Sequence, residues 1–148
     1  MKFTTLAVAA LAGLNFSPAA ASFFIYWSQD PVSGTGAYLY YFFRGHPSCN
    51  DVINARAYTE SDDVSRIQGV VCDGAGCSNG KFEEVKRLEM NTDFGHYTIY
   101  KDRGFGLFDT RDRNLGSCRP TREHSFTCGA PFSMSGITMF YCDSSVNP

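Results

Sequence analysis

Six cysteines constrain the fold of this chain more than any other feature of its sequence. They stand at Cys49, Cys72, Cys77, Cys118, Cys128 and Cys142. An even number of cysteines in a short secreted chain predicts a disulfide framework, whose connectivity the sequence does not specify. The alternative is a metal site, but four residues separate Cys72 from Cys77 and no histidine is near to complete a cysteine–histidine set. We therefore expect disulfides and no metal.

The N-terminus has the pattern of a secretory signal peptide. Lys2 is followed by an apolar run over residues 6–14 and by three alanines that end at Ala21. We predict a signal peptide over residues 1–21, cleaved after Ala21. The apolar run is shorter than the roughly 20 residues that span a bilayer, and no later run is long enough. We expect an extracellular, secreted protein without a membrane span.

Cleavage leaves residues 22–148 as a single secreted cysteine-rich β domain. The whole chain has 13 basic and 15 acidic residues, and Lys2 lies in the signal, so the mature chain has a net charge of −3. A nucleic-acid binder normally carries a clustered basic face. We therefore expect no nucleic-acid partner.

Aromatic and β-branched runs with alternating polarity predict strands. Residues 81–90 fit either a helical stripe or a strand, and we favour a strand that enters a hairpin loop at residues 91–95. The fold class we expect is mostly β, as a small disulfide-stapled β-sandwich or a two-module β fold. The other expected strands cover residues 23–27, 37–44, 67–72, 96–101 and 136–142, with less regular candidates at 105–109 and 124–128.

The two-module alternative comes from a faint internal repeat. The step from Cys49 to Cys72 is 23 residues, and the step from Cys118 to Cys142 is 24 residues. If each module closed its own bridge, Cys77 and Cys128 would join the two modules. Chance similarity between cysteine-rich β sequences explains the repeat equally well.

No nucleophile elbow, HExxH motif or phosphate loop occurs in the chain. Three histidines are available for general acid–base chemistry: His46, His96 and His124. Glu123 and His124, close to Arg119 and Arg122, come nearest to a ribonuclease-like set. We expect no catalytic residue and no cofactor, and we keep His96 and His124 as the candidates should the protein be a small secreted hydrolase.

A segment after the strand at 96–101 resembles the opening hairpin of a βγ-crystallin module. Tyr100 and Phe105 match the aromatic positions of that family, and Gly106 stands one position before its glycine. The family implies a calcium loop, of which Asn114 and Ser117 match two positions. Half a loop supplies too few oxygen ligands for Ca²⁺, so we expect no calcium site.

The chain as a whole resembles the small secreted cysteine-rich proteins of filamentous fungi, a class with effectors and antimicrobial proteins. The resemblance is one of format, namely a signal peptide, a short chain, six cysteines and many aromatic residues. It implies a non-enzymatic binding protein that acts on a host or competitor target without a cofactor.

Exposed aromatic side chains are the expected binding surface, because Tyr and Trp give a large contact area at low entropic cost. The alternative is that both sheet faces are covered and these residues belong to the core. We expect the target to be an extracellular protein or glycan. One alternative function is carbohydrate or cell-wall binding through Trp27 or Tyr38. The sequence leaves the oligomeric state open. The candidate binding residues are Trp27, Tyr38, Tyr40 and Tyr100.

Overall fold

A computed structural model of the chain describes residues 21–29, 36–129 and 133–148. The predicted signal peptide lies outside the described residues except for Ala21, which begins the first strand. No helix in the described ranges is long and apolar enough to cross a membrane.

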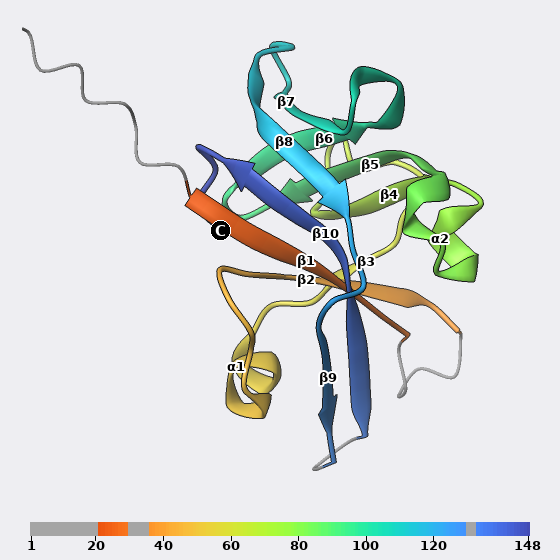
Figure 1. Ribbon diagram of the computed structural model, residues 1–148, viewed down its shortest axis with the longest axis vertical. Helices are drawn as coiled ribbons and strands as arrows, with labels where there is room; N and C mark the ends of the chain where they lie inside the picture. Colours follow the sequence, from red (N-terminus) through yellow and green to blue (C-terminus); the bar gives the residue numbers. More distant parts are fainter. Residues whose placement is uncertain (1–20, 30–35, 130–132) are drawn as a thin grey trace, which may run out of the picture.

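The described residues form ten strands, two short helices and two 3-10 turns (Figure 1). In chain order these elements are β1 (Ala21–Gln29), β2 (Tyr38–Phe43), α1 (Cys49–Asn54), β3 (Tyr58–Thr59), β4 (Gly69–Gly74), α2 (Gly76–Asn79), the 3-10 turn η1 (Phe82–Glu84), β5 (Val85–Thr92), β6 (Gly95–Tyr100), the 3-10 turn η2 (Lys101–Arg103), β7 (Gly106–Asp109), β8 (Asn114–Pro120), β9 (Ser125–Cys128) and β10 (Met134–Ser144).

The strands make one sheet in the order β3-β2-β1-β10-β8-β7-β6-β5-β4, and β9 pairs with β10 beside this path. A parallel bridge between Glu60 and Val70 joins the two ends of the sheet. There the amide of Ser61 donates to the carbonyl oxygen of Val70 at 2.9 Å. The sheet is therefore nearly closed on itself.

The expectation of a mostly β, disulfide-stapled fold is confirmed. The strands form a single nearly closed sheet where we expected two packed sheets or two modules. The long strand β10 explains this difference, because it pairs with β1 from the first half of the chain and with β8 and β9 from the second half. Figure 1 shows β9 and the first half of β10 projecting from one end of the sheet, on the side where α1 lies.

The ambiguous segment at residues 81–90 enters a hairpin, as favoured from the sequence. It forms η1 and then most of β5, which pairs with β6 from Arg87–Tyr100 to Thr92–Gly95. A full helical stripe does not form, because β5 buries every second side chain from Leu88 to Thr92.

Two hydrophobic clusters stabilise the molecule. The larger one fills the inside of the sheet and includes Phe23, Ile25, Leu88, Met90 and Phe140. The smaller one lies on the outer face of β1 and β2, where α1 and β9 cover it. Its buried members are Tyr26, Tyr41, Val52, Phe126 and Cys128.

All six cysteines are paired, which confirms the disulfide framework. The bridges are Cys118–Cys142, Cys49–Cys128 and Cys72–Cys77. The first was expected from the internal repeat and connects directly opposed residues of β8 and β10. The repeat was wrong for the other two pairs. Cys72 in β4 is bonded to Cys77 in the following helix α2, and Cys49 at the start of α1 is bonded to Cys128 at the end of β9.

Candidate functional site

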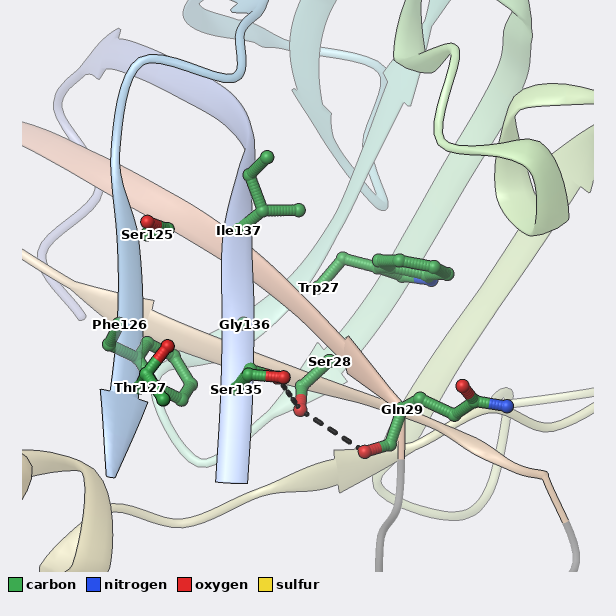
Figure 2. Close-up of a pocket in the computed structure, with 9 residues that line it drawn as sticks. All are labelled: Trp27, Ser28, Gln29, Ser125, Phe126, Thr127, Ser135, Gly136 and Ile137. Atoms are coloured by element: carbon green, nitrogen blue, oxygen red, sulfur yellow. Dashed lines mark hydrogen bonds between the residues drawn. The ribbon is translucent and has the colours of Figure 1, made fainter. Parts of the chain in front are cut away.

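An open cleft lies where the end of β1 meets β9 and the first half of β10 (Figure 2). Its volume is about 300 Å³, which is at the lower end of the range of small-molecule sites. Figure 2 shows Ile137 between β9 and the indole of Trp27. The lining residues are Trp27, Ser28, Gln29, Ser125, Phe126, Thr127, Ser135, Gly136 and Ile137.

Strand alternation explains why hydroxyl side chains gather in this cleft. Successive side chains of a strand point to opposite faces. On β9, Ser125 and Thr127 are exposed, while Phe126 between them is buried in the outer cluster. On β10, Ser135 is exposed and Ile137 is half-buried, while Gly136 between them is buried. The cleft therefore receives two exposed hydroxyl side chains from β9 and one from β10.

The floor of the cleft is fixed by Ser28 and Gly136, which are opposite each other in the β1–β10 register. The Ser28 side chain is buried, and its hydroxyl donates to the carbonyl oxygen of Ser135 at 2.6 Å. A Cβ atom at Gly136 would lie 2.5 Å from the ring of Phe126. Glycine is therefore required for the three strands to meet at this distance.

Trp27 forms one wall and is held by two other rings. Its ring centroid lies 4.8 Å from that of Tyr38 and 5.8 Å from that of Phe82. The indole Nε1 is buried and has no hydrogen-bond partner among the described residues. Tyr38 comes from β2 and Ile137 from β10, on opposite sides of β1, so Tyr38 supports the indole and the cleft opens on the other side.

None of the nine described lining residues carries an ionisable side chain. The polar groups in the cleft are hydroxyls, the Gln29 amide and the backbone. Hydroxyls both donate and accept hydrogen bonds, and the amide offers one group of each kind. The chemistry of the described lining therefore suits a ligand with hydroxyl groups.

The structure brings together two of the four candidate binding residues, Trp27 and Tyr38. Tyr40 was expected at a binding surface, but it is fully buried in the main cluster. Its hydroxyl donates to the carboxylate of Glu60 at 3.1 Å, and burial raises its pKa. We correct this expectation, because Tyr40 belongs to the core.

Tyr100, the fourth candidate, lies in a different cleft of about 510 Å³ with Asp73, Lys86, Arg87, Lys101 and Asp102. The guanidinium of Arg103 lies 5.6 Å from the centroid of its ring. This cleft mixes charges of both signs, so it shares no chemistry with the Trp27 cleft.

The histidines are divided between two places. His96 on β6 lies 2.8 Å from Glu89 of β5, atom Nε2 to Oε1. His124 meets His46, with ring centroids 3.5 Å apart. No histidine is among the described residues that line the Trp27 cleft or the Tyr100 cleft. Catalysis by His96 or His124 stays an untested alternative.

The charged residues expected around His124 are already paired. The guanidinium of Arg119 makes two hydrogen bonds of 3.2 Å to Glu123. Arg119 thereby lowers the pKa of the Glu123 carboxyl. Arg122 instead donates to the carbonyl oxygen of Gly80 at 2.9 Å. Arg119, Arg122 and Glu123 therefore do not point together at one substrate position.

No group of three or more histidine, cysteine or acidic side chains that could hold a metal ion occurs in the described ranges. In the segment that resembles a βγ-crystallin loop, the Asn114 side-chain oxygen accepts from the amide of Gly116 at 2.9 Å. This oxygen therefore already has a hydrogen-bond partner within the protein.

Sequence reasoning missed the hydroxyl side chains of the cleft and the partner of His124. The alternation of Ser125 and Thr127 around Phe126 was a usable signal, since it marks a strand with one polar face. His46 had no such signal, because its neighbour comes from a distant part of the chain.

Comparison with known proteins gives no assignment: no family model, no curated protein and no solved structure matches this chain.

Proposed function

We propose that this protein is an extracellular, non-enzymatic binding protein that recognises a neutral glycan of a host or competitor through the Trp27 cleft. The observation that carries the proposal is that a fixed tryptophan and exposed hydroxyl side chains line the same cleft, whose described lining has no charge. Predicted secretion and the three disulfides support an extracellular site of action. The effector or antimicrobial role rests on the resemblance in format to fungal secreted proteins.

The chemistry of sugars fits this cleft. One face of a pyranose ring presents C–H groups, which pack on an aromatic ring, and its edge presents hydroxyl groups. Ser125, Thr127 and Ser135 offer hydroxyls that donate to and accept from that edge. Trp27 is held in place before binding by Tyr38 and Phe82, so little conformational freedom is lost when a ligand binds.

The test is binding of the mature protein to neutral polysaccharides and their soluble oligomers, namely chitin, β-glucan, cellulose and mannan. Thr127→Val keeps the side-chain shape and removes one hydroxyl. We expect it to weaken binding of the preferred oligomer roughly threefold to tenfold, since one hydrogen bond is lost. Trp27→Ala should weaken binding roughly thirtyfold or more, as expected for a central aromatic contact. Isothermal titration calorimetry measures both effects.

Thr110→Val is the matched control, because Thr110 is exposed on the turn between β7 and β8, outside the cleft. Its affinity should equal that of the wild type. The proposal is wrong if no neutral glycan binds, or if Thr110→Val and Thr127→Val lower the affinity equally. Thr127→Val is the decisive variant, since Trp27→Ala also removes packing against Phe82.

A further inference from the structure

Two histidines from distant parts of the chain meet on the surface of the molecule. His46 lies between β2 and α1, and His124 directly precedes β9. Their ring centroids are 3.5 Å apart, with an angle of 74° between the ring planes. His46 is exposed and His124 is half-buried, so solvent reaches the pair.

A disulfide holds the two segments together. Cys49 follows His46 by three residues, Cys128 follows His124 by four, and these cysteines are bonded with their Cα atoms 5.5 Å apart. The backbone of His124 is also fixed to Thr138, whose side-chain oxygen accepts from the amide of His124 and donates to its carbonyl oxygen, both at 3.1 Å. Covalent and hydrogen bonds therefore impose the proximity of the two imidazoles.

The surroundings orient the imidazole rings. Phe24 lies against both of them, stacked on His46 at 5.6 Å and edge-on to His124 at 5.4 Å. The Tyr26 hydroxyl lies 3.4 Å from Nδ1 of His46. With Nδ1 next to this hydroxyl, Nε2 of His46 is the nitrogen left for another partner.

We infer that His46 and His124 form a binding site for a divalent transition-metal ion, each supplying one ring nitrogen. Two metal–nitrogen bonds of about 2 Å at about 90° require ring centroids roughly 4.4 Å apart, so the rings must separate from their present 3.5 Å when the metal binds. His46 is exposed, so its ring can turn to give this separation. Neutral imidazole is a good ligand for Cu²⁺, Ni²⁺ and Zn²⁺, whereas Mg²⁺ and Ca²⁺ prefer oxygen ligands. Among the divalent ions, Cu²⁺ binds nitrogen sites most tightly. Two protein nitrogens leave the remaining coordination positions to water. Glu123, next to His124 in the chain, adds a nearby negative charge, which its ion pair with Arg119 partly offsets.

The probe is CuCl₂ titrated into the mature protein, which must carry no histidine tag. We expect one Cu²⁺ ion to bind per protein molecule, as measured by calorimetry. Electron paramagnetic resonance should show nitrogen hyperfine lines, which report imidazole ligands. His46→Ala and His124→Ala should each weaken Cu²⁺ binding about tenfold or more, because one of two protein ligands is lost.

His96→Ala is the matched control, since His96 lies on β6 with Glu89 and away from the pair. Its Cu²⁺ affinity should equal that of the wild type. Cu²⁺ should also raise the thermal unfolding midpoint of the wild type and of His96→Ala, because a ligand stabilises the state that binds it. The increase should be smaller for His46→Ala and for His124→Ala.

Three results would overturn the inference. The first is no detectable binding of Cu²⁺ to the wild type by calorimetry. The second is an equal loss of binding in His96→Ala. The third is cleavage of RNA by the wild type in excess chelator that is lost in His46→Ala, which would make the pair an acid–base pair. Glycan binding is measured separately in the same variants, so failure of the metal site leaves the Trp27 proposal unaffected.

Discussion

Gly116 shows how one missing side chain sets the distance between two strands. Its φ is +152°, a conformation that residues with a Cβ rarely adopt. A Cβ atom built there would lie 2.6 Å from the Cα atom of Ser144 on β10 and would also overlap the carbonyl oxygen of Asp143. These are backbone atoms of a paired strand, so they cannot move without disturbing the register of β8 and β10.

We predict that Gly116→Ala lowers the free energy of unfolding by about 2–4 kcal/mol, from backbone strain and overpacking together. Urea denaturation checks this, with an unchanged m-value expected. Gly129→Ala is the control, because no described residue lies within 4 Å of a Cβ atom built at Gly129. Equal stability of the two variants would contradict the close approach of β8 and β10.

Alternation along a strand indicates which aromatic residues share a face, but not how deeply each is buried. Tyr38 and Tyr40 are two residues apart on β2, so alternation places them on the same side. Tyr38 lies near the end of the sheet and is half-buried, whereas Tyr40 lies over the main cluster and has no exposed surface. The burial of a side chain depends on where its strand lies in the sheet. That position is set by pairing with segments distant in the chain, which a local sequence pattern does not reveal.

Helix α1 is an element that the sequence analysis did not predict. It has six residues, too few for a hydrophobic period to be visible. A capping box begins it: the amide of Asp51 donates to the Ser48 hydroxyl at 3.2 Å, and the amide of Ser48 donates to the Asp51 carboxylate at 2.8 Å. The helix then buries Val52 in the outer cluster, which connects its local start signal to tertiary packing.

We predict that Ser48→Ala lowers the free energy of unfolding by about 1 kcal/mol, as for other N-cap residues. Hydrogen bonds from Ser48 lower the pKa of Asp51 below its ordinary value of 3.8. This stabilisation is therefore present above pH 3.8 and is lost as the pH falls through the lower folded pKa.

Urea denaturation at pH 7 and pH 2 measures both effects. The difference in stability between the wild type and Ser48→Ala should shrink as the pH is lowered from 7 to 2, because protonation of Asp51 removes the carboxylate that Ser48 stabilises. Ser117→Ala, an exposed serine of β8, should resemble the wild type at both pH values. A difference between Ser48→Ala and the wild type that grows at pH 2 would argue against the cap.

For the whole molecule, the sequence predicted the class of the fold better than its connections. Alternation and cysteine content indicated a disulfide-stapled β protein. Closure of the sheet depends on Glu60 and Val70, which pair through a single bridge and leave no local pattern. The disulfide between Cys49 and Cys128 was missed for a similar reason, because it connects segments brought together only by the outer cluster.

The three disulfides close loops of very different length, with sequence separations of 79, 24 and 5 residues. Restricting the unfolded chain should therefore give about 4.5, 3.5 and 2 kcal/mol of stabilisation, respectively. We predict this order of destabilisation for paired Cys→Ala replacements, measured by urea denaturation without reductant. If loss of Cys72–Cys77 proved the most damaging, loop entropy would not be the main contribution.

The pairing of Ser22 with Asp143 has a practical consequence for labelling, because Ser22 is the first residue of the predicted mature chain. Strand β1 runs from there to Gln29, a length of roughly 23 Å at about 3.3 Å per residue, and Gln29 lines the Trp27 cleft. A fluorescent reporter attached at Ser22 would therefore be separated from that cleft by the length of the strand. Such a label should leave the proposed glycan site accessible, so that the labelled protein can be imaged on intact cell walls.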